Sequence, residues 1–131
     1  RNVMQQRGKK GNTDDLLAAS FKELLCKAPM EKITIKDITD KAGVIRPTFY
    51  NHFADKYALL EYIVRHDLLE PIKPLLLNDM IQEGLTLLFS SMQNERAFYE
   101  RAYEVTPTIK HRKGCRLLNR LRVFWALFSA K

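Results

Sequence analysis

Residues 46 to 53 concentrate side chains that can form directional hydrogen bonds. The sequence RPTFYNHF holds arginine, threonine, tyrosine, asparagine and histidine, and it has no acidic residue. On a helical wheel Phe49 and Phe53 lie close together, so we expect both rings to be buried. The opposite side is formed by Pro47, Thr48, Tyr50 and Asn51, with Arg46 and His52 on the flanks. The pattern predicts a helix over 46–53 whose outward surface can approach a polyanion.

The chemistry available to that surface is recognition of nucleic-acid bases and phosphates. A helix fits the DNA major groove, where asparagine pairs with adenine, arginine pairs with guanine, and threonine or proline contacts a thymine methyl group. Lys36 and Lys56 flank the helix in the sequence and are predicted to hold the sugar-phosphate backbone. The competing interpretation makes Tyr50 and His52 ordinary exposed helix residues, and the motif around them favours DNA contact.

A second short helix and a glycine turn precede this segment. Thr34 is a start signal, with Asp37 three positions later as the carboxylate of a capping box. Apolar residues follow at helical spacing, at Ile35, Ile38 and Ala42. Gly43 is placed to end that helix in the left-handed conformation, and Arg46 and Pro47 suit the N-cap and first position of the next one. The sequence therefore predicts two short helices joined by a sharp turn.

The run ITIKDITDKAGVIRPTFYNHFADKYALL resembles the DNA-binding domain of the TetR family of transcriptional regulators. The shared features are an apolar-Thr-apolar start, a K-A-G-V turn, a T-F-Y-x-H-F recognition helix and a D-K-x-x-L-L opening of the following helix. The resemblance covers about residues 13 to 66, and it departs from the family at Ile45, where a serine is frequent. It implies DNA binding by Lys36, Arg46, Pro47, Thr48, Tyr50, Asn51, His52 and Lys56, to which we add Thr34 at the helix start.

The resemblance also carries expectations about function. It implies a bacterial homodimer bound to a palindromic operator of double-stranded DNA and acting as a repressor, either constitutively or under the control of a small-molecule effector. The stretch QNERAFYERAYEV is similar to members that regulate dihydroxyacetone kinase genes. The alternative from another class is a helical protein-interaction adaptor that uses its basic, aromatic C-terminal segment, residues 106–131. No residue is predicted to bind the effector.

The whole chain is predicted to be all-α, in two domains. Residues 1–54 form a basic arm and the DNA-binding domain, and residues 55–131 form a regulatory and dimerisation domain with an atypical end at 106–131. Further helices are predicted at 13–27, 55–69, 75–92 and 94–105, with a kink or break at Pro71 and Pro74. Burial is predicted for Leu17, Phe21, Leu24 and Ala28, with Leu25 at the edge of their face, and for Ile81, Leu85, Leu88 and Phe89. Asp14 and Asp15 are assigned to the first turn of their helix.

Composition agrees with a polyanionic partner. The 131 residues carry a formal net charge of +7 with a pI near 9.5. Two cysteines without metal-ligand spacing, Cys26 and Cys115, predict neither a disulfide framework nor a metal site, and therefore a cytoplasmic location. No apolar run is long enough to cross a membrane. No catalytic or cofactor-binding motif is recognisable, so we expect neither an enzyme nor a cofactor.

Several alternatives stay open at this point. The arm of residues 1–12 is either a solvated tail or a minor-groove reader. The aromatic residues between 57 and 105 are expected to be core rather than effector ligands. The C-terminal stripe of Leu117, Leu121, Phe124, Trp125 and Phe128 is expected to pack on this chain or on a second copy rather than on a membrane.

Overall fold

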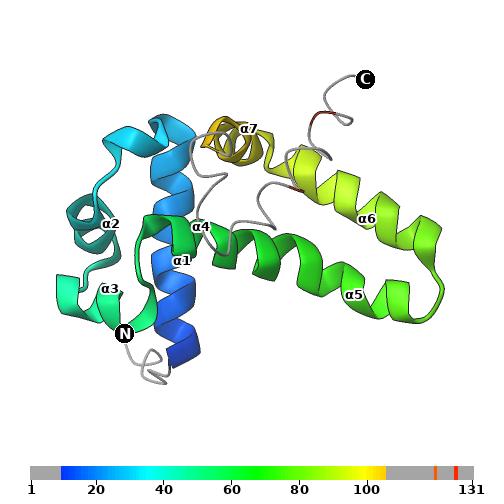
Figure 1. The fold of residues 1–131 in the computed structure, drawn as a ribbon, viewed down its shortest axis with the longest axis horizontal. Helices are drawn as coiled ribbons and strands as arrows, with labels where there is room; N and C mark the ends of the chain where they lie inside the picture. The colour runs from blue at the N-terminus through cyan, green and yellow to red at the C-terminus, as the bar shows by residue number, and fades with distance from the viewer. Residues whose placement is uncertain (1–9, 106–119, 121–125, 127–131) are drawn as a thin grey trace. The chain divides into compact units, whose positions relative to one another are not determined.

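The computed structural model describes residues 10–105, together with Arg120 and Ala126, and every regular element among them is a helix (Figure 1). The prediction of an all-α chain is thereby confirmed. The chain divides into two compact units, and the boundary between them falls inside one helix, between Leu59 and Leu60. Predictions for residues 1–9 and for the C-terminal stripe lie outside the described residues.

The first unit is built from three helices that follow one another closely. Its elements are α1 (Lys10–Lys27), the 3-10 turn η2 (Met30–Lys32), α2 (Ile35–Ala42), α3 (Arg46–His52) and the beginning of α4 (Lys56–Val64). Helix α2 packs against both α1 and α3 (Figure 1). The predicted order of short helix, turn and short helix is therefore present.

The core of the first unit is formed by one stripe of α1 and the inner faces of the shorter helices. Leu17, Phe21 and Leu25 are fully buried, whereas Leu24 and Ala28 are only half-buried. The prediction that placed Leu24 inside and Leu25 at the edge is wrong, because the buried stripe recurs every four residues and so drifts by about 40° at each step. Other buried members are Met30, Ile33, Ile38, Ala42, Phe49 and Leu59.

Helix α1 begins three residues earlier than predicted, at Lys10. The single glycine within it, Gly11, costs a helix only about 1 kcal/mol relative to alanine, which is too little to fix the helix start. Asp14 and Asp15 consequently lie beyond the first turn, which contains no acidic residue. The prediction that both carboxylates serve the helix N-terminus is wrong.

The turn between α2 and α3 forms as the sequence predicts. Thr34 accepts a hydrogen bond from the Asp37 backbone N–H, and the Asp37 carboxylate accepts one from the Thr34 N–H, both at 3.0 Å. Gly43 has φ 77° and ψ 30°, in the left-handed region. The Val44 N–H donates to the Thr39 carbonyl at 3.0 Å and the Gly43 N–H to Asp40 at 3.3 Å, which is the Schellman arrangement. The capping box and the glycine turn are both confirmed.

The second unit contains the rest of α4, the π-helical segment η3 (Arg65–Leu69), α5 (Glu70–Leu77), α6 (Ile81–Asn94) and α7 (Arg96–Val105). The predicted break at Pro71 and Pro74 is wrong, because the chain stays helical through both prolines. In η3 the Glu70 N–H reaches back five residues to the Arg65 carbonyl, and Pro71 then falls in the first turn of α5, where its missing N–H matters least.

The chain instead reverses at residues 78–80, where Asp79 has φ 60°. The Asn78 side chain donates to the Pro74 carbonyl at 2.9 Å and so satisfies one of the last carbonyls of α5. The predicted helix over 75–92 is therefore replaced by the end of α5, a turn and α6. Helices α5 and α6 then run side by side as a hairpin (Figure 1).

The face that α6 buries differs from the prediction. Gly84, Leu88 and Met92 are buried, while Ile81 and Leu85 are exposed. A Cβ on Gly84 would lie 3.0 Å from a methyl carbon of Leu76, so α6 approaches α5 closely at this glycine. The prediction of burial is confirmed for Leu88 and is wrong for Ile81 and Leu85. The side of α6 that lies against α5 is the side of Gly84, so Ile81 and Leu85 stay exposed.

Candidate nucleic-acid interface

Helix α3 presents the predicted polar side chains on its outer side. Arg46, Pro47, Tyr50 and Asn51 are exposed and Thr48 is half-buried. Phe49 is fully buried beneath them, as the helical wheel predicts. Phe53, the other predicted anchor, is half-buried and has extended backbone angles, so it ends the helix rather than continuing it. The outer surface of α3 is thus available to a partner.

Aromatic contacts hold this helix at its centre. The Phe49 ring lies 5.9 Å from the Phe53 ring and meets the Tyr50 ring edge-on at 5.5 Å, so the position of Tyr50 is coupled to the core. The N-terminal end is held less well, because the N-cap residue is Ile45, a hydrocarbon side chain that cannot accept a hydrogen bond. Helix α3 begins at Arg46, one residue before the predicted first position.

Lys36 on α2 is exposed but already has an acidic neighbour. Its ammonium group lies 2.8 Å from the Asp40 carboxylate, one helical turn away. The hydrogen bond that Lys36 donates to the Asp40 carboxylate raises the pKa of Lys36, and the charge on Asp40 acts in the same direction. A phosphate that binds Lys36 therefore has to compete with Asp40.

Lys56 faces the interior of the first unit. Its ammonium group donates to the carbonyl oxygens of Met30 and Ile33, each at 2.7 Å, and so ties the beginning of α4 to η2. Partial burial lowers the pKa of Lys56, with the carboxylates of Glu31 and Asp37 opposing that shift. The position assigned to a phosphate contact is thus used within the protein, and contact between Lys56 and DNA stays a prediction.

His52, the last residue of α3, is also directed inward. Its Nδ1 atom lies 2.6 Å from a carboxylate oxygen of Asp14 on α1, and its side chain is only 12% exposed. Contact between His52 and DNA likewise stays a prediction. Sequence reasoning missed Asp14 as a partner, although a signal was present: Asp14 continues the buried stripe of α1 by one turn before Leu17.

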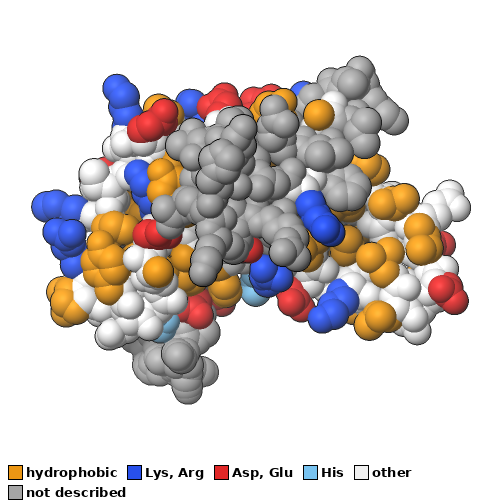
Figure 2. Space-filling model, viewed as in Figure 1, with side chains coloured by type: hydrophobic (Ala, Val, Ile, Leu, Met, Phe, Trp, Pro, Cys, Tyr) orange, Lys and Arg blue, Asp and Glu red, His pale blue; other side chains and the backbone are white. Residues whose placement is uncertain are grey.

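Thr34 is exposed, and its hydroxyl oxygen is occupied by the capping box described above. The hydrogen bond from the Thr34 backbone N–H lowers the pKa of Asp37, and that from its side chain acts in the same sense. Thr34 therefore fixes the start of α2. Figure 2 shows Lys and Arg side chains on the surface near α2 and α3.

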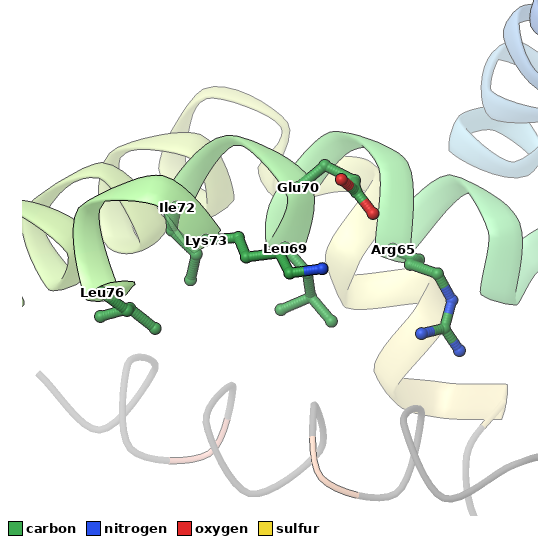
Figure 3. A pocket seen from close by; sticks show the side chains of 6 residues that line it. All are labelled: Arg65, Leu69, Glu70, Ile72, Lys73 and Leu76. Atoms are coloured by element: carbon green, nitrogen blue, oxygen red, sulfur yellow. The ribbon is translucent and has the colours of Figure 1, made fainter. Parts of the chain in front are cut away.

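The second unit offers a groove of a different kind. It has a volume of about 270 Å³ and is lined by Arg65, Leu69, Glu70, Ile72, Lys73 and Leu76. Figure 3 shows these side chains along one side of η3 and α5. Apolar side chains are also exposed near the α5–α6 turn (Figure 2), namely Leu76, Leu77, Met80, Ile81 and Leu85.

The described part of the chain holds neither a cluster of metal-ligating side chains nor a membrane-spanning helix. Over residues 10–105, Arg120 and Ala126, histidine, cysteine and carboxylate side chains form no group able to hold a metal ion. In the same residues no helix combines the length and apolar character needed to cross a membrane.

Comparison with known proteins identifies the class. Residues 15–63 match the family of bacterial regulatory proteins described as the tetR family. This stretch contains the capping box, the Gly43 turn and the whole of α3. Over these residues the chain matches the TetR family of helix-turn-helix regulators, as its sequence motifs predicted.

Two relatives and one solved structure are similar to this chain. The chain is 29% identical over 104 residues to the HTH-type dhaKLM operon transcriptional activator DhaS of Lactococcus lactis subsp. lactis (strain IL1403). It is 32% identical over 91 residues to the uncharacterized HTH-type transcriptional regulator YxbF of Bacillus subtilis (strain 168). A solved structure, the dihydroxyacetone kinase operon activator DhaS, superposes with a TM-score of 0.62 at 29% identity. The two matches named DhaS agree with the predicted likeness to regulators of dihydroxyacetone kinase genes.

The relatives are longer than this chain. The aligned part covers 76% of this chain and 53% of the lactococcal protein, and 63% of this chain and 24% of the Bacillus protein. For the solved structure the shares are 76% and 56%. The adaptor alternative depends on residues 106–131, which lie outside the continuously described part of the chain, and it stays a prediction.

Proposed function

We propose that this chain is a TetR-type DNA-binding transcription regulator and that it reads DNA through the outer side of α3. The observation that carries the proposal is the division of α3 into two sides. Phe49 is fully buried, whereas Tyr50 and Asn51 point outward next to Arg46. A seven-residue helix held in this way can lie in the major groove with its N-terminal half against the base edges.

The operator is proposed to be an inverted repeat bound by a homodimer. Recognition helices of a symmetric dimer reach two half-sites about one helical turn apart, roughly 34–36 Å. The support for pairing is family membership, and the test is the molar mass of the full chain in solution, free and on a duplex. A monomer that binds a single half-site would contradict the dimer.

The direction of regulation has two supports that disagree. The family resemblance favours a repressor, while the lactococcal relative is named a transcriptional activator. We propose the repressor, because a bound dimer needs no further partner to block a promoter. A promoter–reporter fusion in cells with and without the protein decides the matter, since a higher reporter signal with the protein present would identify an activator.

An effector is proposed for the second unit. A ligand changes DNA affinity only if it binds the DNA-free state more tightly than the DNA-bound state. The groove beside Arg65 and Lys73 is the first place to look for it. Lys73→Ala should then weaken effector binding without changing DNA affinity in the absence of effector.

DNA binding is tested in two steps: duplexes that the chain binds are selected first, and the affinity of substituted chains for those duplexes is then measured. Duplexes retained from a random pool are used in gel-shift titrations over a salt series, with the full chain. Arg46→Ala combined with Tyr50→Ala should abolish binding while the helical circular dichroism spectrum is unchanged. Lys73→Ala, which removes one positive charge from the second unit, is the matched control. Unchanged affinity in the double variant would overturn the proposal.

A further inference from the structure

The contact between Asp14 and His52 is a long-range feature of the first unit that has no part in the proposed reading of DNA. It joins residues 38 positions apart, with a separation of 2.6 Å between the carboxylate oxygen and Nδ1. The two side chains are 24% and 12% exposed. A second ion pair between α1 and a neighbouring helix, Glu23 with Lys41 on α2, is far more open at 63% and 36%.

The chemistry of the pair fixes the state of the imidazole ring. An ionised carboxylate can only accept hydrogen bonds, so Nδ1 must carry the hydrogen in this contact. The bond therefore selects one tautomer when the ring is neutral and becomes an ion pair when it is protonated. In both states the ring is held in one orientation against α1.

The position of the pair matters because of the way α3 is built. The helix has seven residues, its N-cap is Ile45, and its central anchor is Phe49. His52 is its last helical residue, so the bond to Asp14 ties the C-terminal end of α3 directly to α1. Without that bond α3 could pivot about Phe49 and carry Tyr50 and Asn51 with it.

We propose that Asp14 is a positioning residue for DNA binding, acting through His52 to fix the orientation of α3 against α1. The inference rests on the proposed function, and it gives His52 a role different from direct contact with DNA. Most of the ring surface is buried, so the side chain serves recognition from behind the helix rather than at its outer face.

Two substitutions of His52 separate positioning from contact. In asparagine the amide nitrogen is the same number of bonds from Cβ as Nδ1, so His52→Asn can still donate to Asp14. In glutamine the nitrogen is one bond further out, near the place of Nε2, and is displaced from Asp14. We expect His52→Asn to bind DNA within about threefold of the unsubstituted chain and His52→Gln to bind about tenfold more weakly or worse. The reverse order would identify a contact made through Nε2 and overturn the inference.

The second arm of the experiment tests Asp14 directly. Asp14→Ala should weaken binding to the selected duplex by about tenfold, while Glu23→Ala, which removes another interhelical carboxylate from α1, should leave it unchanged. Nitrogen-15 spectra of the His52 ring should show the hydrogen on Nδ1 in the unsubstituted chain and a mixture of tautomers in Asp14→Ala.

The outcomes distinguish this inference from the proposed function. If the unsubstituted chain retains no duplex from the pool, the proposed function fails, and the positioning role fails with it. If it binds DNA and Asp14→Ala binds as tightly as Glu23→Ala, only the inference is overturned. Should Asp14→Ala fail to fold, the comparison of His52→Asn with His52→Gln still decides the question.

Discussion

Replacing Lys56 by methionine should destabilise the first unit without removing a DNA contact. Methionine keeps an unbranched stem of similar length, so the change removes the ammonium group and little packing. That group donates to the carbonyls of Met30 and Ile33, each at 2.7 Å. A hydrogen bond from a charged donor contributes about 1.5–3 kcal/mol, so the two bonds together set an upper limit near 6 kcal/mol.

Two effects reduce that figure. Burial lowers the pKa of Lys56, which means that holding the charged form there already has a cost that methionine removes. The site is only partly buried, so water can reach the two carbonyls after substitution. We therefore expect a loss of about 2 kcal/mol, which for a small domain corresponds to a decrease in Tm of roughly 8–16 °C.

The measurement is thermal unfolding followed by circular dichroism, with Lys73→Met on the exposed side of α5 as the control. The same two variants are then compared in DNA titrations at a temperature where both are folded. A lysine that neutralises one phosphate contributes about 0.9 to the slope of log affinity against log salt. We expect no change in that slope for Lys56→Met. A Tm close to that of the control together with a slope lower by about 0.9 would refute the reasoning, because Lys56 would then bind phosphate rather than η2.

Three further predictions concern stability. Thr34→Ala removes the capping-box oxygen and should lower the free energy of unfolding in urea by about 1 kcal/mol, whereas Thr34→Ser should keep most of it. Equal stability of the Thr34→Ala and Thr34→Ser variants would contradict a stabilising role for this oxygen. Gly43→Ala should cost about 1–2 kcal/mol, and Gly43→Asn less, because among the described atoms a Cβ there meets open space and the cost comes from φ 77° alone. Burial, with the charges of Asp67 and Glu95, raises the pKa of Tyr99 above its ordinary value of 10.0, so the unfolded chain loses this proton first and stability falls as pH rises past that value. Urea midpoints between about pH 9 and about pH 11 should therefore decline less in Tyr99→Phe, and parallel declines would contradict the assignment.

The features that could be predicted from the sequence are those decided by near neighbours. The capping box joins Thr34 to Asp37, and the turn at Gly43 depends on the conformation of one residue. Each requires only a few consecutive residues, so their types are sufficient. The burial of Phe49 follows from the same short-range periodicity.

The features that were missed depend on residues far apart in the chain. Lys56 and its carbonyl partners are 26 and 23 positions apart, and Asp14 and His52 are 38 apart. Charged side chains in such places look like surface residues in the sequence, and only the fold brings them to their partners. Lys56 and His52 were both predicted to contact DNA, and each of them already has a partner inside the protein.

The error at Pro71 and Pro74 has a different cause. Proline normally ends a helix, but the wider π-turn immediately before Pro71 lets the helix continue. The real reversal is marked by Asn78 and Asp79, both typical turn residues, and Asp79 adopts a positive φ. Two prolines gave the stronger signal in the sequence and drew the predicted break to the wrong place.

The π-helical segment Arg65–Leu69 also bears on how this helix can change in length. Its hydrogen bonds reach back five residues instead of four, so the segment accommodates one residue more than an α-turn. Deleting one residue here would restore a continuous α-helix and keep Ile72 facing the same neighbours. The same deletion within α6 would turn every later side chain by about 100° and remove Leu88 and Met92 from the core. Related chains that differ in length by one residue should therefore differ within this segment.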